Sequence, residues 1–152
     1  MSDMEIIAGI GLGVIGLALA FYVLYVIGCW KAFAKAGEPG WKSLIPVYNQ
    51  YIQFRLVWNT TAFWLTLALG VASGTLQSMA NNYPDAAWLT ILVTLVSIAA
   101  FVVYVMLNLR IAKAYGKGTG FGIGLIVFPY IFMIILGWGN SVYAGNPEAA
   151  MQ

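Results

Sequence analysis

Four long apolar runs follow one another along the chain, over residues 6–29, 62–78, 88–109 and 121–138. Each comes close to the roughly 20 residues that a helix needs to cross a bilayer. The runs are continuous rather than alternating, which favours helices over transmembrane β-strands. The pattern predicts an all-α membrane protein, a single domain over residues 1–152 with four transmembrane helices.

A shorter and more polar segment, residues 46–58, separates the first two runs. Pro46 is tolerated in a first helical turn. One helix over 46–76 would be about 46 Å long, which exceeds the hydrocarbon core of about 30 Å. Asn59-Thr-Thr61 supplies a break, with a threonine able to cap the next helix. We therefore expect a short cytoplasmic interfacial helix before the second span; a tilted, extended second span is the alternative.

The composition supports a membrane location. The chain is 62% hydrophobic and 8% charged, whereas soluble domains carry about 25% charged residues. A soluble fold is therefore excluded. The net charge of +2 also argues against a nucleic-acid partner, because such partners call for a strongly basic surface.

The cations predict the orientation. All seven lie in two segments, 30–58 and 110–120, whereas the acids Asp3, Glu5, Asp85 and Glu148 lie near the opposite ends of the spans. Short cationic loops stay cytoplasmic. The pattern predicts that both basic segments are cytoplasmic and that both termini lie outside.

Small residues at helical spacing predict where helices pack. Close packing holds membrane helices together, since lipid offers no hydrophobic driving force. A stripe of small residues can pack against another helix of the chain or against a partner. Pro129 should kink the last span. The predicted packing residues are Gly9, Gly13, Gly16 and Ala20 in the first span, Gly70 in the second, and Gly120 and Gly124 in the fourth.

Candidate chemistry is sparse. The chain has no His and one cysteine, Cys29, and no span carries an ionisable residue of the kind that intramembrane catalysis or ion coupling uses. We expect no enzymatic activity, no metal and no cofactor, although a bound lipid or pigment would leave no motif. The glycine-rich segment around Lys117 and Gly118 fits either an anion site or a tight turn. Arg110 and Lys113 lie nearby and could contact anionic headgroups.

Two motif stretches resemble a family of small bacterial membrane proteins of unknown function. They are Lys35-Ala-Gly-Glu-Pro-Gly-Trp41 with Pro46-Val-Tyr-Asn49, and Gly116-Lys-Gly-Thr-Gly-Phe-Gly122. The resemblance implies an inner-membrane location and no established activity; some members are linked with signal peptidase I. Six residues are expected to shape the cytoplasmic face, in a structural or partner-contacting role. They are Pro39, Pro46, Tyr48, Asn49, Lys117 and Gly118.

The leading hypothesis is a non-enzymatic accessory or structural subunit of a larger bacterial inner-membrane complex. The expected partners are membrane lipids and either other membrane subunits or further copies of the chain. A small homo-oligomeric channel or transporter is the alternative, since Thr and Ser could line a pore. A helper of secretion or signal-peptide processing is a third hypothesis, from the resemblance alone.

Overall fold

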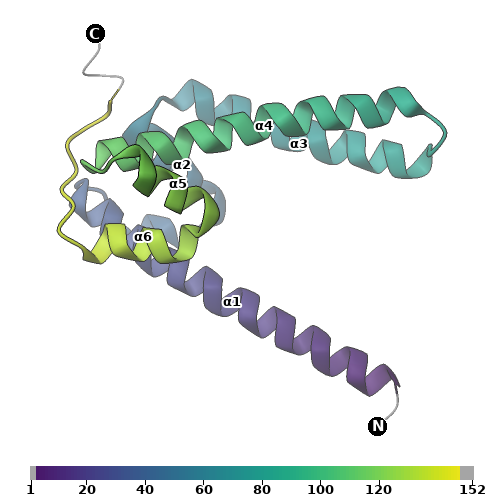
Figure 1. Cartoon of the computed structure of the whole chain (residues 1–152), viewed down its shortest axis with the longest axis horizontal. Coiled ribbons are helices and arrows are strands. Elements are labelled where there is room, and N and C mark those ends of the chain that lie inside the picture. The colour runs from purple at the N-terminus through teal and green to yellow at the C-terminus, as the bar shows by residue number, and fades with distance from the viewer. Residues whose placement is uncertain (1–2, 148–152) are drawn as a thin grey trace.

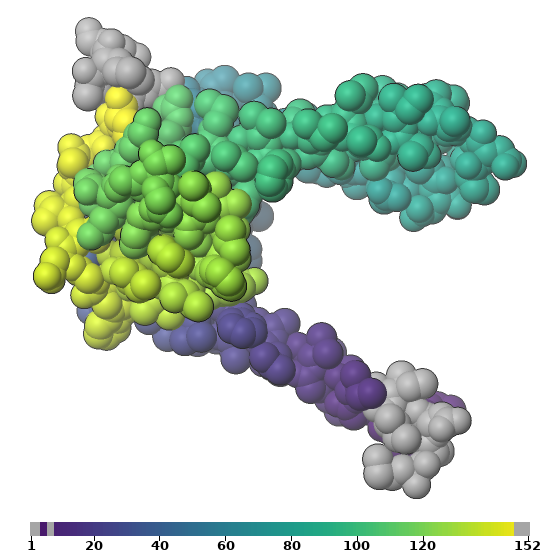
Figure 2. Space-filling model, viewed as in Figure 1, coloured from purple at the N-terminus to yellow at the C-terminus, as the bar shows by residue number. Residues whose placement is uncertain are grey.

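The computed structural model describes residues 3–147, except for the side chains of residues 3, 6 and 7. The described chain forms helices joined by turns (Figure 1). A compact base is formed by the last residues of the long first helix α1 (25–35), by the short helices η1, α2, α5 and α6, and by residues 139–147. Two arms project from it and diverge, with open space between them (Figure 2). The elements in chain order are α1 (Asp3–Lys35), η1 (Gly40–Ser43), α2 (Pro46–Val57), α3 (Thr60–Asn82), α4 (Ala87–Ala114), α5 (Thr119–Val127) and α6 (Pro129–Trp138).

The first arm is the outer part of α1. The whole helix has 33 residues, about 50 Å at 1.5 Å per residue. Residues 8–24 are all exposed. Two helical segments, Ala8–Lys35 and Ala87–Ala114, are long and apolar enough to cross a membrane.

The second arm is the antiparallel hairpin of α3 and α4. Half-buried and buried positions recur along both helices at alternating spacings of four and three residues. This spacing is typical of the contact seam between two helices that coil around each other with a left-handed twist. The small residues in this seam let the two backbones approach closely. The seam positions are Ala62, Thr66, Leu69, Ser73, Leu76 and Ala80 on α3, and Leu89, Val93, Val96, Ala100, Val103 and Leu107 on α4.

The predicted fourth span is wrong as a single helix. The chain breaks at Phe128, and α6 begins at Pro129, whose missing N–H suits a first turn. The α6 helix then folds back on α5, with the Phe121 and Phe132 ring centroids 5.1 Å apart. The two helices have 9 and 10 residues, about 14–15 Å each, and neither reaches across a core of about 30 Å.

The short helix before the second span is present as α2, separate from α3. Asn59 makes the break, and its side chain accepts a hydrogen bond from the Ala62 N–H at 2.7 Å; it therefore caps α3 in place of the predicted threonine. An interfacial helix would turn its amides to water. Instead Asn49 and Gln53 are buried, so α2 is packed into the base.

The C-terminal segment also lies differently from the prediction. The Tyr143 hydroxyl donates to the Leu56 carbonyl at 2.6 Å, and the Ala144 N–H donates to the Ala114 carbonyl at 2.7 Å. Residues 139–147 therefore lie at the base, among the basic segments, rather than at the opposite end as the expectation of two outside termini requires. The reason is the reversal at Phe128. Glu148 lies outside the described residues.

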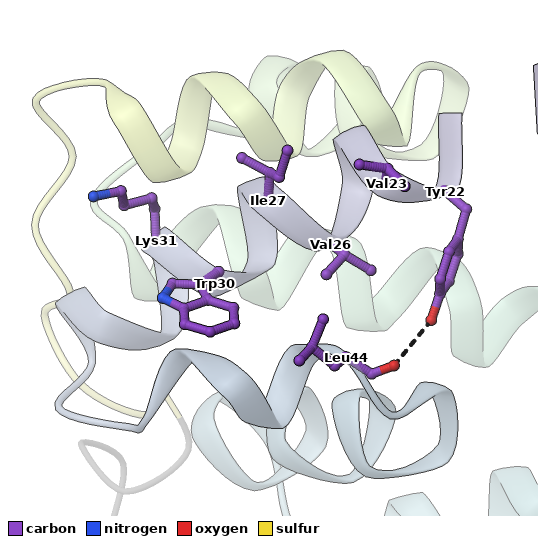
Figure 3. A pocket seen from close by; sticks show the side chains of 7 residues that line it. All are labelled: Tyr22, Val23, Val26, Ile27, Trp30, Lys31 and Leu44. Carbon is purple, nitrogen blue, oxygen red and sulfur yellow. Dashed lines mark hydrogen bonds between the residues drawn. The ribbon is translucent and has the colours of Figure 1, made fainter. Parts of the chain in front are cut away.

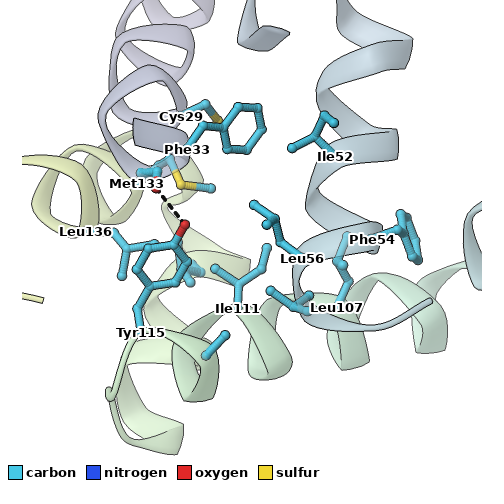
Figure 4. Close-up of a cluster of buried hydrophobic side chains, with 14 of the residues drawn as sticks. Cys29, Phe33, Ile52, Phe54, Leu56, Leu107, Ile111, Tyr115, Met133 and Leu136 are labelled. Atoms are coloured by element: carbon cyan, nitrogen blue, oxygen red, sulfur yellow. Dashed lines mark hydrogen bonds between the residues drawn. The ribbon is translucent and has the colours of Figure 1, made fainter. Parts of the chain in front are cut away.

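The core lies in the base, where α1, α2, α4, α5 and α6 meet (Figure 4). The Tyr115 hydroxyl donates to the Ala32 carbonyl at 2.8 Å and joins the end of α4 to α1. Burial raises the pKa of the Tyr115 phenol well above its usual value, so it stays a neutral donor. Buried members from these helices are Cys29, Phe33, Ile52, Leu56, Ile111, Leu125, Met133 and Leu136.

Candidate functional site

A buried polar network joins α1, η1 and α2 in the base. The Gln53 amide lies 2.8 Å from both the Tyr25 hydroxyl and the Asn49 side-chain oxygen, and 3.7 Å from Cys29 Sγ. The Asn49 amide donates to the Ser43 carbonyl at 3.1 Å. Among the described residues, no buried side-chain N or O atom lacks a partner. Such a satisfied network orients helices, and Asn49, predicted as a contact residue, is one of its members.

Above the network lies a layer of aromatic side chains. Tyr48 stacks on Tyr51 with centroids 5.9 Å apart and lies 6.1 Å from the Trp41 ring. Pro39 and Pro46 are exposed on either side of η1, whereas Tyr48 is half-buried. Of the predicted contact residues on this face, these two prolines and Tyr48 reach the surface.

A carboxylate holds two cations beside this layer. Glu38 lies 2.5 Å from the Lys42 ammonium and 2.9 Å from the Arg55 guanidinium. The hydrogen bond to Glu38 is the main cause of the raised pKa of Lys42. Glu38 and Lys42 are half-buried and Arg55 is exposed, so the cluster fixes the turn after α1 against α2.

The second basic segment ends α4 with a glycine turn. Gly116 has φ +67°, its N–H donates to the Lys113 carbonyl, and the Lys117 N–H donates to the Ala112 carbonyl at 2.8 Å. These paired bonds form a Schellman cap, and Gly118 then caps α5. The geometry matches the tight-turn reading of this segment, because the Lys117 N–H is already engaged.

The three cations of this segment border a second face of the base. The Arg110 guanidinium lies 4.3 Å from the Trp58 ring centroid, and the Lys117 ammonium 5.9 Å from that of Phe121. Lys113 is exposed. The first contact joins the ends of α4 and α2, so the two basic segments, 30–58 and 110–120, belong to one folded base.

Of the glycines predicted to pack against another helix, one does so in the structure and the others do not. A Cβ at Gly124 would meet the Phe132 ring, whereas a Cβ at the other predicted glycines would have no heavy atom within 4 Å. Ala20 is also exposed. The stripe on α1 therefore makes no close contact within the described chain, and a partner for it stays a prediction. The open positions are Gly9, Gly13, Gly16, Gly70 and Gly120.

The closest helix contact uses glycines outside those stripes. A Cβ at Gly28 would lie 2.7 Å from the Met133 carbonyl carbon, and one at Gly137 would lie 2.6 Å from the Gly28 carbonyl oxygen. The backbones of α1 and α6 therefore touch where these glycines meet. The sequence signal was weak, since neither glycine belongs to a repeating stripe.

An apolar groove of about 380 Å³ follows α1 beside this contact (Figure 3). Sequence reasoning missed it, because its wall includes Leu44, far from α1 in the chain. The Tyr22 hydroxyl closes one end with a 3.3 Å bond to the Leu44 carbonyl, and Lys31 lies at the other end. The lining residues are Tyr22, Val23, Val26, Ile27, Trp30, Lys31 and Leu44.

Lys35 caps the end of α6, and its removal should release the C-terminal segment. Its ammonium donates to the Leu136 and Gly139 carbonyls, both at 2.7 Å, and to the Ser141 hydroxyl at 3.1 Å. A cation stabilises a helix C-terminus. We expect Lys35→Met to cost about 1–2 kcal/mol and to speed hydrogen exchange of residues 139–147. Lys113→Met, at an exposed position, is the control. Unchanged exchange in Lys35→Met would contradict the cap.

Comparison with known proteins identifies a family for this chain but no activity. No curated protein and no solved structure matches the chain. Residues 41–146 match a family described as "Family of unknown function (DUF5684)". The match confirms the resemblance to a family of unknown function, whereas the link with signal peptidase I stays a prediction. Because the match covers more than half of the sequence, the chain belongs to the DUF5684 family.

Proposed function

We propose that the protein is an integral protein of a bacterial inner membrane in which α1, α3 and α4 cross the bilayer. Two helical segments, in α1 and α4, are long and apolar enough to do so, and α3 pairs with α4 along its length. The α5–α6 hairpin is too short to cross and would be re-entrant, shielded by the base as irregular backbone at membrane depth must be.

The charges support an orientation for this arrangement. All seven cations lie between residues 31 and 117, in the base, whereas Glu5 and Asp85 lie at the outer ends of the arms. The positive-inside rule then puts the base at the cytoplasmic side of the membrane. This topology keeps the N-terminus outside and moves the C-terminal segment to the cytoplasmic side.

Within that membrane we propose a non-enzymatic accessory or structural role. The observation that carries it is the small-residue stripe on the outer part of α1, from Gly9 to Ala20, which packs against nothing in the described chain. Residues 8–24 are exposed, and a small-residue stripe runs along them with open space above each glycine. Such a stripe lets another helix approach closely. The buried polar network, by contrast, is satisfied and holds the base together.

The test is native mass spectrometry of the protein extracted at its natural expression level in mild detergent. Ala20 lies on the stripe, and Ala18 lies on the opposite face of the same helix, because two residues turn a helix by about 200°. Both are exposed, so Ala20→Leu and Ala18→Leu form a matched pair. Overpacking an interface costs about 1–3 kcal/mol, and we expect Ala20→Leu alone to weaken association with other polypeptides about 5- to 100-fold.

Two results would overturn this role. One is a wild-type protein that runs as a lone monomer, and the other is equal association of both variants. A mass that is a clean multiple of the 16.5 kDa chain would favour the homo-oligomeric channel instead, and liposome flux would then be measured.

A further inference from the structure

We propose that the groove on α1 binds one acyl chain of an anionic phospholipid, with the phosphate at Lys31. This inference rests on the proposed membrane location and specifies which lipid the base holds. The groove is formed by one face of α1 and by Leu44, which follows η1 (Figure 3). Its lining is apolar apart from its two ends.

The walls are fixed by close contacts rather than by loose packing. Gly28 admits the α6 backbone on one side of α1. On the other side, the Ser43 hydroxyl donates to the Val26 carbonyl at 3.3 Å and holds η1 in place. The Trp30 ring packs on Gly40, where a Cβ would lie 2.2 Å from it. The groove is therefore preformed, as small-molecule sites usually are.

The length of the groove matches one leaflet. Nine residues separate Tyr22 from Lys31, which is about 14 Å along a helix. Half of a hydrocarbon core of about 30 Å is about 15 Å. The Lys31 end is the one nearer the base, which the proposed topology puts at the cytoplasmic surface, and the Tyr22 end then lies near the bilayer midplane. A lipid of the inner leaflet would thus have its chain in the groove and its headgroup beside Lys31.

Charge selects the headgroup. The Lys31 ammonium lies 4.9 Å from the Trp138 ring centroid, and none of the ion pairs found among the described residues involves it. An ammonium has three donors, so one ring contact leaves donors for a phosphate. Trp30 and Trp138 flank it, and indoles favour the headgroup level. An apolar slot with a cation at one end is complementary to an anionic amphiphile rather than to a wholly apolar helix.

The experiment is native mass spectrometry of delipidated, detergent-solubilised protein titrated with dioleoyl-phosphatidylglycerol or dioleoyl-phosphatidylcholine. One cation near a lipid surface contributes about 1 kcal/mol, so we expect Lys31→Gln to weaken phosphatidylglycerol binding about fivefold and to leave phosphatidylcholine binding unchanged. Val23→Trp, at an exposed lining position, should weaken both lipids.

Two variants control for charge and bulk away from the groove. Lys113→Gln and Leu19→Trp alter exposed residues outside the lining. Leu19→Trp should bind both lipids as the wild type does, and Lys113→Gln, at a separate expected headgroup contact, should weaken phosphatidylglycerol binding less than Lys31→Gln does. Equal loss of phosphatidylglycerol in Lys31→Gln and Lys113→Gln would overturn the site, as would full binding by Val23→Trp. A groove filled by a second copy of the chain would also overturn it. The lipid-binding results leave the proposed subunit role untouched, and that role fails separately if the wild type purifies alone. A second copy in the groove would favour the homo-oligomeric channel.

Discussion

Replacing Gly28 by alanine is expected to lower the free energy of unfolding by about 3 kcal/mol, one of the two largest effects we predict. The added Cβ would lie 2.7 Å from the Met133 carbonyl carbon and 2.8 Å from the Ile134 nitrogen. Both are backbone atoms, so no flexible side chain can move aside. Overpacking costs about 1–3 kcal/mol and occasionally more, and because both contacts here are with fixed backbone we expect a cost of about 4 kcal/mol. It outweighs the gain of about 1 kcal/mol that alanine brings to a helix.

The matched control is Gly16→Ala in the same helix. A Cβ there would have no heavy atom within 4 Å, so only the helix-propensity gain remains, and this variant should be as stable as the wild type or slightly more so. Thermal unfolding in mild detergent, followed by circular dichroism, measures both. If Gly28→Ala fails to accumulate while Gly16→Ala accumulates normally, the contact is supported. Equal stability of the two variants would contradict the docking of α6 on α1.

The sequence predicts the long helices because each is marked by residues that lie close together in the chain. The charge-free run before Trp30 and the break at Asn59 are both visible in short windows, and both are present. The reversal between α5 and α6 is not local. Pro129 is compatible with a kink or with a turn back, and the choice depends on Phe132 packing against Gly124 and on α6 docking beside Gly28.

The buried polar network likewise depends on contacts between separate elements, which the sequence pattern does not show. Asn49 belongs to the motif expected to shape the cytoplasmic face in a structural or partner-contacting role, and the structure buries it. Its partners are Ser43 and Gln53, and only the fold of η1 against α1 makes them available. The stripe from Gly9 to Ala20 likewise has the spacing of a packing face, yet α6 meets α1 further along, at Gly28. Spacing shows that a close approach is possible without showing which helix makes it.

The second large effect is expected for Gln53→Leu, which removes the hub of the buried network. Leucine has a similar volume, so little cavity forms. The Asn49 side-chain oxygen and the Tyr25 hydroxyl, however, lose the amide that lies 2.8 Å from each. A buried polar group left without its partner costs about 1–3 kcal/mol. With two such groups, we expect the free energy of unfolding to fall by about 3 kcal/mol.

Gln50→Leu is the control, since Gln50 is exposed on the same helix and its replacement should change stability by less than about 0.5 kcal/mol. Asn49→Ala should cost about 2 kcal/mol alone and add little to Gln53→Leu, because members of one network are not independent. Additive losses in the double variant would show that the two amides act separately. Hydrogen exchange at η1 separates a local opening from global unfolding: the Asn49 amide holds the Ser43 carbonyl, so η1 should exchange first when the network is cut.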